Sequence, residues 1–320
     1  VNIIKSLDLL IIDEISMVRA DTLDAIDSAL RRYKNRYQPF GGVQLLMIGD
    51  LQQLAPVVKD EDREILSKYY DSYFFFGSKA LSTTEYVSIE LKHIYRQNDQ
   101  VFIDLLNKSR DNNVDQEVLK GLNKRYIPDF DPDSGGGYIT LTTHNYQAQQ
   151  INDSKLEKLP GRTHSFTATI KDEFPELSYP NSNELILKVG AQVMFVKNDL
   201  SRDKLFFNGK IGKVKSFEDD IIVVKCPDDD FNIRVEMVEW QNVKYTINDE
   251  TKEIEEEVIG TFTQYPLKLA WAITIHKSQG LTFERAVIDA CAAFAHGQVY
   301  VALSRCRSLS GLVLSSRINQ

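Results

Sequence analysis

The chain has 320 residues, of which 42% are hydrophobic and 26% are charged. These values are near the average for globular proteins and exclude a wholly disordered, collagen-like or fibrous chain. A chain of this length holds about two domains, each large enough to bury a core without disulfides. No apolar run approaches the roughly twenty residues that cross a bilayer, and no export signal opens the chain, so we expect an intracellular protein without a membrane partner. Three scattered cysteines without a C-x-x-C pair also favour a reducing, intracellular location.

The net charge of −8 is unevenly distributed along the chain. Between Glu218 and Glu257 there are fourteen Asp and Glu residues against four Lys and Arg residues, a local charge of −10. The remainder of the chain therefore carries +2. Because the acids are segregated, the overall charge does not exclude a polyanionic partner in a basic groove elsewhere.

The first predicted elements form a strand–helix–strand unit. Leu7–Ile12 is a short, nearly all-apolar run, typical of a strand covered on both faces in a parallel sheet. Apolar side chains then recur at spacings of three and four, which predicts an amphipathic helix over Asp21–Tyr37. Val43–Ile48 predicts a second buried strand. This order is the repeating unit of a parallel α/β sheet.

A second α/β region follows, interrupted by a β-rich segment. Tyr138–Leu141 predicts a strand and Asn145–Leu159 a helix, and the α/β pattern returns at Leu267–Ile275 and Leu312–Ser315. Between them, residues 204–260 contain short β-rich stretches separated by Asp, Asn and Gly turns. This pattern is typical of a small antiparallel barrel or meander. We therefore expect the β-rich segment to be an insertion in the second α/β domain.

Two acids, Asp13 and Glu14, directly follow the first predicted strand. Open α/β sheets bind ligands at the carboxyl ends of their strands. Adjacent acids there can hold a hydrated Mg²⁺ and polarise an attacking water, although most such pairs are solvated surface residues. Their position after a buried strand favours the functional interpretation.

Gly49–Leu54 follows the next strand and adds the polar side chains Asp50 and Gln53. If the two strands are neighbours, these side chains lie beside the first acid pair. An amide accepts a hydrogen bond from water and donates one to phosphate, so Gln53 could contact a γ-phosphate. By pattern alone, a polar loop is an equally good interpretation.

Five motifs occur in the order found in superfamily-one helicases. They are Asp13-Glu-Ile-Ser-Met17, Gly49-Asp-Leu-Gln-Gln-Leu-Ala-Pro-Val57, Leu91-Lys-His-Ile-Tyr-Arg-Gln97, Ile275-His-Lys-Ser-Gln-Gly280 and Val299-Tyr-Val-Ala-Leu-Ser-Arg305. The resemblance extends over nearly the whole chain, because the motifs run from Asp13 to Arg305. They most closely resemble those of the Pif and RecD-like branch, which moves 5′ to 3′ along single-stranded DNA.

The resemblance implies an α/β fold of two RecA-like parallel-sheet domains, the first incomplete, with a small β-barrel inserted in the second. ATP would be hydrolysed between the two domains. The domain boundaries we expect are residues 1–95 for the second half of the first RecA-like domain, 96–203 and 263–320 for the two parts of the second, and 204–262 for the barrel.

The resemblance also implies catalytic roles for five residues. Asp13 would ligate Mg²⁺ through water, and Glu14 would activate the hydrolytic water. Gln53 and Arg96 would contact the γ-phosphate of ATP, and Arg305 would be the arginine finger. Charge spreading over a transferred phosphoryl group favours planar, always-protonated donors, although an arginine more often forms a surface ion pair.

Ligand-contacting residues are implied in two further segments. Gln279 and Gly280 would face the nucleotide. The DNA contacts would come from Thr143, His144, Asn145, Thr274, His276, Lys277 and Ser278. A helix N-terminus at Asn145 would help to hold phosphate, but a structural helix cap by Thr143 or Asn145 is equally compatible with the pattern.

One expected motif does not occur in these 320 residues, the phosphate-binding G-x-x-x-x-G-K-[ST] loop. We therefore expect this chain to be a fragment of a longer ATP-dependent DNA helicase and to be inactive alone. The alternative is a non-hydrolysing single-stranded nucleic-acid-binding module. The helicase interpretation predicts DNA forks or G-quadruplexes as substrates and a role in DNA repair, recombination and genome maintenance. The sequence does not predict an oligomeric state.

Overall fold

The structure is a computed structural model that describes residues 2–133, 136–227, 229–248, 251, 254–291 and 297–318. The chain forms two compact units. The first consists of residues 1–93 and two short later stretches, 245–257 and 295–297; the second consists of residues 94–244, 258–294 and 298–320. Every helix in the described part of the chain is too short or too polar to cross a membrane.

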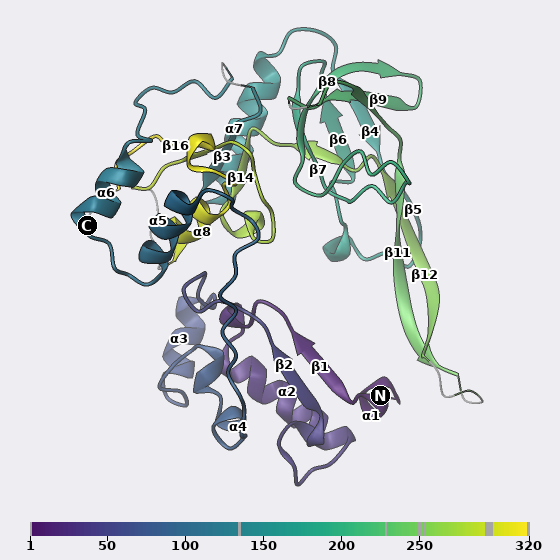
Figure 1. The fold of residues 1–320 in the computed structure, drawn as a ribbon. Helices are drawn as coiled ribbons and strands as arrows, with labels where there is room; N and C mark the ends of the chain where they lie inside the picture. The colour runs from purple at the N-terminus through teal and green to yellow at the C-terminus, as the bar shows by residue number, and fades with distance from the viewer. Residues whose placement is uncertain are drawn as a thin grey trace. The chain divides into compact units, whose positions relative to one another are not determined.

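A two-stranded parallel sheet forms the centre of the first unit (Figure 1). Strand β1 (Leu9–Ile12) pairs along its length with β2 (Gln44–Met47). The chain between them carries helix α2 (Ala20–Tyr33). This confirms the predicted strand–helix–strand unit. Because the strands are parallel neighbours, the segments that follow them leave the same edge of the sheet.

Short elements complete the first unit around α2. The helices are α1 (Asn2–Ser6), α3 (Asp60–Leu66) and α4 (Lys79–Ser82), and single 3-10 turns occur at Ile15–Met17, Pro39–Gly42 and Phe75–Gly77. Helix α2 buries Leu23 and Leu30 in the core of this unit, with Asp21 in its first turn and two arginines in its last. This charge distribution complements the helix dipole.

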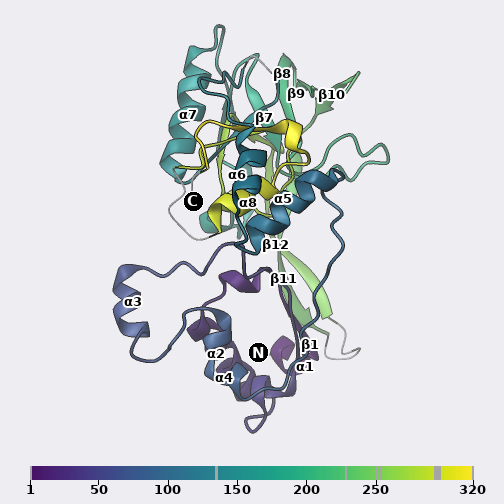
Figure 2. The same cartoon turned by 60° about the vertical axis from the view of Figure 1, so that its left-hand side comes forward.

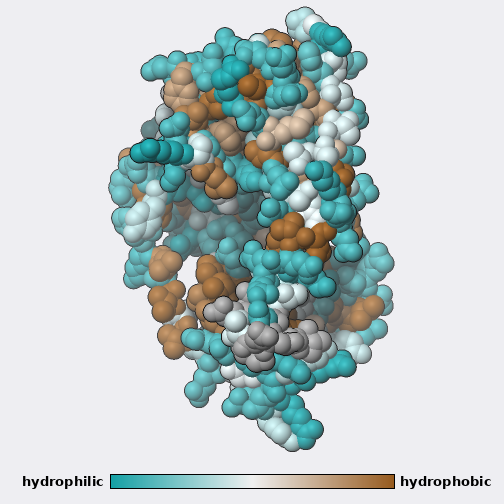
Figure 3. Space-filling model, turned by 90° about the vertical axis from the view of Figure 1, so that its right-hand side faces the viewer, coloured by the Kyte–Doolittle hydropathy of each residue, from teal (hydrophilic) through white to brown (hydrophobic). Residues whose placement is uncertain are grey.

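The prediction that the first strand is covered on both faces is wrong for the described residues. Leu10 and Ile12 pack against the core, but Leu9 is 43% exposed and Ile11 is 55% exposed. The cause is that α2 covers one face of the sheet, whereas no described element covers the other. Apolar side chains also reach the surface elsewhere, as the brown groups in Figure 3 illustrate.

Helix α2 ends four residues earlier than the apolar spacing predicts. Its last backbone hydrogen bond runs from the Lys34 amide to the Leu30 carbonyl, and the Tyr37 amide donates instead to the Asn35 side chain. The chain must turn back here because Gly41 packs against the helix: a Cβ at this residue would lie 2.6 Å from the Leu30 oxygen. Tyr37, the last residue of the predicted helix, is 75% exposed.

The second unit contains a four-stranded parallel sheet in the order β14-β3-β15-β16. The strands are β3 (Ile139–Thr142), β14 (Ala272–Thr274), β15 (Ala286–Ile288) and β16 (Leu312–Leu314), and the helices are α5 (Gln100–Arg110), α6 (Gln116–Asn123), α7 (Asn145–Lys158) and α8 (Gln298–Ser304). Helix α7 packs against β3 and β14, and α5 packs against α6 and α8 (Figures 1 and 2). The parallel sheet agrees with the predicted RecA-like fold.

Antiparallel strands form the rest of the second unit. The five-stranded sheet β10-β9-β8-β7-β13 contains β7 (Gln192–Phe195), β8 (Ile211–Glu218), β9 (Ile221–Lys225), β10 (Asn232–Val235) and β13 (Leu267–Leu269). The three-stranded sheet β11-β12-β5 contains β5 (Thr169–Asp172), β11 (Val238–Ile247) and β12 (Ile254–Gln264), while β4 (His164–Thr167) pairs with β6 (Glu184–Leu187). The described 3-10 turns of this unit lie at Glu176–Ser178, His276–Ser278 and Leu309–Gly311.

The insertion predicted at residues 204–262 is therefore antiparallel, as expected, but it shares its sheets with strands outside that range. Strands β5, β7 and β13 all lie outside it and pair with strands inside it or with one another. Neither large sheet closes on itself within the described residues, so the barrel stays a prediction. Five charged residues of the acidic segment lie outside the described residues: Asp228, Asp249, Glu250, Lys252 and Glu253.

Candidate nucleotide and nucleic-acid sites

Asp13 and Glu14 lie immediately after β1. Glu14 has a left-handed backbone conformation, with φ 49° and ψ 44°, which is uncommon for a residue with a side chain. Its amide donates a 2.8 Å hydrogen bond to Asp13 Oδ1, and the following Ile15 amide bonds to the Ile48 carbonyl beyond β2. Within the described residues the Glu14 carboxylate has no hydrogen-bond or ion-pair partner. It is therefore positioned by the backbone alone and remains available to a ligand.

The segment after β2 approaches this turn closely. A Cβ at Gly49 would lie 2.9 Å from Ile15 Cγ2 and 3.0 Å from the Ile15 amide nitrogen, so a larger residue would force the two segments apart. Asp50 accepts from the Gln52 amide at 3.0 Å and from Gln53 Nε2 at 3.3 Å. Asp50 thereby orients the Gln53 amide, which is half-buried beside the end of the strand.

The carboxylates at this edge fit a hydrated Mg²⁺ ion. Mg²⁺ usually keeps several water ligands and takes only one or two protein carboxylates. Asp13 is exposed, and only its Oδ1 atom accepts a described hydrogen bond. No group of three or more His, Cys, Asp or Glu residues suited to a fully protein-ligated metal occurs in the described ranges. Water-mediated binding through Asp13 is the mode that these residues permit.

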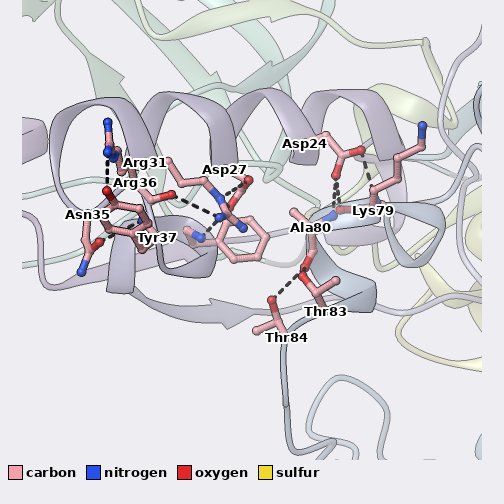
Figure 4. Close-up of polar contacts among 12 residues, drawn as sticks. Asp24, Asp27, Arg31, Asn35, Arg36, Tyr37, Lys79, Ala80, Thr83 and Thr84 are labelled. Atoms are coloured by element: carbon pink, nitrogen blue, oxygen red, sulfur yellow. Dashed lines mark hydrogen bonds and ion pairs between the residues drawn. The ribbon is translucent and has the colours of Figure 1, made fainter.

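Two other carboxylates of the first unit are bound within the protein. Asp24 accepts hydrogen bonds from Ser78 Oγ at 2.5 Å and from Tyr70 Oη at 2.9 Å. It also accepts from the backbone amides of Lys79 and Ala80 at 3.2 and 3.0 Å (Figure 4). Burial alone would raise the pKa of Asp24, but these donors lower it overall. Burial and the neighbouring Asp24 carboxylate raise the pKa of Tyr70 to about 12.

Asp27, one turn further along α2, is 8% exposed. It accepts from Arg31 Nε at 2.7 and 2.9 Å and from the Phe40 amide at 2.5 Å (Figure 4). Asp24 thus fixes the start of α4, and Asp27 fixes the turn before β2. The sequence analysis identified neither role, since both depend on residues distant along the chain.

The two predicted DNA-binding segments lie side by side in the second unit. Thr274, the last residue of β14, is the register partner of Thr142 at the end of β3, and the Ile275 amide donates to the Thr142 carbonyl at 2.8 Å. Each segment begins at the carboxyl end of its strand. The structure therefore brings Thr143–Asn145 and Thr274–Ser278 together at one edge of the sheet.

The first of these segments opens helix α7. His144 is the N-cap residue, but its side chain makes no capping hydrogen bond. Thr143 is 7% exposed, and its hydroxyl contacts His144 Nδ1 at 2.9 Å and Gln147 Oε1 at 3.3 Å. The alternative that Thr143 or Asn145 caps the helix is therefore wrong. His144 and Asn145 are exposed, so their side chains can reach a ligand at the start of the helix.

The second segment separates into buried and accessible residues. Thr274 is 3% exposed and accepts a hydrogen bond from the Lys277 amide, and Ser278 is fully buried with its hydroxyl donating to the Ile275 carbonyl at 2.7 Å. Lys277 is exposed and His276 is half-buried. Burial lowers the pKa of His276, so this imidazole is neutral at pH 7. Lys277 is thus the accessible cation of this segment, whereas Ser278 serves chiefly to hold the turn.

Gln279 and Gly280 complete the turn. The Nε2 atom of Gln279 is buried without a described hydrogen-bond partner, an arrangement that is costly unless a ligand or water satisfies it. Gly280 has φ +73°, and nothing lies within 4 Å of the position that a Cβ would occupy. Open space and an unsatisfied donor are compatible with the expected nucleotide contact.

Arg96 and Arg305 both contact the C-terminal end of α8. Arg96 Nη1 lies 3.4 Å from the Ser304 carbonyl, while Arg305 donates to the Val301 carbonyl at 3.1 Å and to Ser304 Oγ at 2.8 Å. Arg305 is only 2% exposed. The Arg305 guanidinium is thus folded back onto its own helix, whereas the sequence analysis expected it to be the arginine finger.

Gln97, next to Arg96, is a residue whose role the sequence analysis missed. It is 5% exposed and donates to the carbonyls of Ser304 and Cys306 at 3.0 and 2.9 Å. Its amide ties the segment before α5 to the end of α8. Gln97 does lie in the Tyr-Arg-Gln motif. The order of the motifs alone, however, does not distinguish a residue that contacts a ligand from one that forms hydrogen bonds within the protein.

Comparisons with known protein families agree with this arrangement. The model of PIF1-like helicases matches residues 1–120, and that of the UvrD-like helicase C-terminal domain matches residues 269–313. The chain is 38% identical to the human ATP-dependent DNA helicase PIF1 over 95% of the chain and 45% of that protein. It is 30% identical to the Pif1 helicase of Campylobacter jejuni over 98% of the chain and 70% of that protein. The chain spans about half the length of most of the curated relatives it matches.

Solved structures give the same assignment. A Bacteroides sp. Pif1 in complex with ADP-AlF4 matches with a TM-score of 0.91 and 44% identity, over the whole chain and 73% of that protein. The Bacteroides Pif1 bound to single-stranded DNA matches with a TM-score of 0.66 and 44% identity, over 99% of the chain and 72% of that protein. Relatives at this identity that are covered over most of their length share a family as well as a fold. The chain belongs to the PIF1-like helicase family.

Proposed function

We propose that the full-length protein is an ATP-dependent DNA helicase that moves 5′ to 3′ along single-stranded DNA. The observation that carries this proposal is the pairing of β1 with β2, since it gathers two helicase motifs, with Asp13, Glu14, Asp50 and Gln53, at one edge of a sheet. The named activity of the human and Campylobacter relatives supports the same assignment.

The first unit would supply the groups for ATP hydrolysis. Asp13 would hold a water ligand of Mg²⁺. Glu14, whose carboxylate has no partner among the described residues, would accept a proton from the attacking water. Gln53, oriented by Asp50, would contact the γ-phosphate. Mg²⁺ held there through Asp13 would supply neutralisation of charge on the phosphate oxygens.

The second unit would supply cations and the DNA-binding surface. Arg96 and Arg305 would stabilise charge that develops on the γ-phosphate, as guanidinium forks do in phosphoryl transfer. Gln279 and Gly280 would contact the nucleotide.

The exposed N-terminus of α7 and Lys277 suit contacts to a DNA phosphate, because backbone amides and ammonium groups are common phosphate donors. Thr143, His144, Asn145, Thr274, His276 and Ser278 would shape this surface. DNA forks and G-quadruplexes are the substrates we propose, and repair or recombination of DNA inside the cell is the process in which we place the protein.

The test is hydrolysis and unwinding by the full-length protein. We expect ATP hydrolysis stimulated by single-stranded DNA, and unwinding of a duplex with a 5′ single-stranded tail but not of one with a 3′ tail. Glu14→Gln should abolish both activities while leaving DNA binding intact. Tight DNA binding without any hydrolysis by the unaltered full-length protein would instead support the non-hydrolysing binding module.

A further inference from the structure

A cavity of about 580 Å³ lies within the second unit, between α7, β6, β13 and β14. Its volume is within the roughly 300 to 1,000 Å³ typical of ligand-binding pockets. Three of the proposed DNA-binding residues, Asn145, Thr274 and Lys277, line it. The cavity therefore lies next to the proposed DNA-binding surface, at the start of α7.

Lys268 lines the same cavity, although no motif identifies it. It is the middle residue of β13, and its neighbour Leu267 is fully buried in the core. Lys268 itself is half-buried. Burial and, to a smaller extent, the positive charge of Lys277 together lower the pKa of Lys268 to about 8. Two like charges thus line one cavity, Lys268 from β13 and Lys277 from the 3-10 turn that follows β14.

Neither of these two ammonium groups has an anionic partner among the described residues, since no ion pair or side-chain hydrogen bond involves Lys268 Nζ or Lys277 Nζ. The two acids that line the cavity form no described ion pair with either lysine. Asp153 accepts from Gln149 Nε2 at 2.7 Å, and Glu184 accepts from Ser165 Oγ at 2.8 Å. Both lysines of the cavity are therefore without a described ion pair, although two carboxylates line the same space.

We propose that this cavity binds a backbone phosphate of single-stranded DNA between the ammonium groups of Lys268 and Lys277. A partly buried cation beside a like charge is unfavourable unless an anion compensates both, and a phosphate oxygen can accept from each lysine. Asn145 and Thr274 border the same space with polar atoms. The inference rests on the proposed helicase function and adds a phosphate site and a residue, Lys268, to its DNA-binding surface.

The test is the binding of fluorescein-labelled oligothymidylate to the full-length protein without nucleotide, followed by fluorescence anisotropy at several salt concentrations. Lys268→Met should lower the affinity about tenfold, since a hydrogen bond to a charged group contributes roughly 1.5 to 3 kcal/mol. The slope of log affinity against log salt should fall by about 0.7, the value for one phosphate contact on a single strand. Lys268→Arg should keep most of the affinity, because it keeps the charge.

Lys188→Met is the matched control. Lys188 is half-buried in the same unit, but its ammonium donates to the carbonyls of Glu157 and Leu159 at the end of α7. This variant should bind oligothymidylate with the affinity and salt slope of the unaltered protein. Lys277→Met changes an exposed residue and repeats the test if Lys268→Met does not fold.

A pH series gives an independent readout. Lys277, Asp153 and Glu184 are the other charged groups that line the cavity. Because Lys268 loses its proton near pH 8 in the free protein, affinity should fall more steeply between pH 7 and 9 for the unaltered protein than for Lys268→Met. Equal affinity and salt slope in both proteins would overturn the inference. Failure of the unaltered protein to bind oligothymidylate at all would instead contradict the proposed function.

Discussion

Helix α2 and the cavity beside α7 both withdraw charged groups from water, but they do so in different ways. Asp24 and Asp27 on α2 each receive hydrogen bonds from several donors of their own unit. The half-buried Lys268 lines a cavity with the exposed Lys277, and neither lysine has a described ion pair. A charged side chain that is hydrogen-bonded within the protein supports the fold. A partly buried charge without such partners indicates a ligand-binding site.

Arg305 gives the strongest test of this distinction, because it has hydrogen-bond partners within the protein and is nevertheless expected to contact the nucleotide. Arginine fingers contribute about 10³ to 10⁵ in rate, so Arg305→Lys in the full-length protein should lower DNA-stimulated ATP hydrolysis by at least about 10³. A lysine cannot reproduce the planar fork. Binding of single-stranded DNA without nucleotide should be retained. If a stably folded Arg305→Lys variant hydrolyses ATP at a near-normal rate, Arg305 has a structural role. Arg307 would then be the next candidate for the arginine finger.

Glu14 belongs with the groups that lack partners. Glu14→Gln keeps the shape of the side chain and removes the base, so ATP hydrolysis should fall by about two orders of magnitude or more. The midpoint of urea unfolding should stay unchanged, because the carboxylate makes no described contact. Glu64→Gln, on the exposed surface of α3, is the control and should hydrolyse ATP normally. Turnover within a few-fold of normal in Glu14→Gln would remove Glu14 from the mechanism.

Asp27 should show the opposite combination of effects. Asp27→Asn leaves Arg31 without its carboxylate, and breaking a buried ion pair costs about 3 kcal/mol or more. We expect a loss of this size in the free energy of unfolding, measured with urea, and nearly normal hydrolysis at temperatures where the variant stays folded. Asp21→Asn, which removes a more exposed pair with Arg19, should cost about 1 kcal/mol or less. Equal losses of unfolding free energy in the two variants would contradict the distinction between the buried and the more exposed ion pair.

Asp24 adds a smaller effect with a defined pH dependence. Its pKa is lowered in the folded protein, so its contribution to stability is present above the unfolded pKa of about 3.9 and is lost as the pH falls. Asp24→Asn should cost about 2 kcal/mol at pH 7, and the cost should shrink toward pH 3. Urea unfolding at pH 7, 5 and 3 measures this trend, and a cost independent of pH would show that the charge of Asp24 does not matter.

Sequence patterns predicted the elements well where the pattern depends on near neighbours. Strand β2 lies within the predicted range Val43–Ile48, and α7 begins at the predicted Asn145. The patterns failed where distant segments decide the outcome. The end of α2 depends on the approach of Gly41, and the exposed face of β1 depends on what packs above it.

The candidate sites divide in the same way. Motif order identified the residues at the ends of β1, β2, β3 and β14, because each motif follows its strand directly. It could not separate Ser278, which bonds internally, from the accessible Lys277. Lys268 carries no motif, and only the folded chain brings it beside Lys277.

The most direct test of the distinction between partnered and unpartnered charges is the stability of Lys268→Met with and without DNA. In the free protein Lys268 binds its proton more weakly than an unfolded lysine does, so the charged group destabilises the fold at pH 7 and its removal should raise the urea midpoint or leave it unchanged. With saturating oligothymidylate the order should reverse, because the unaltered protein binds DNA more tightly and gains more stability from it. A variant that is less stable in both conditions, by the same amount, would contradict the account.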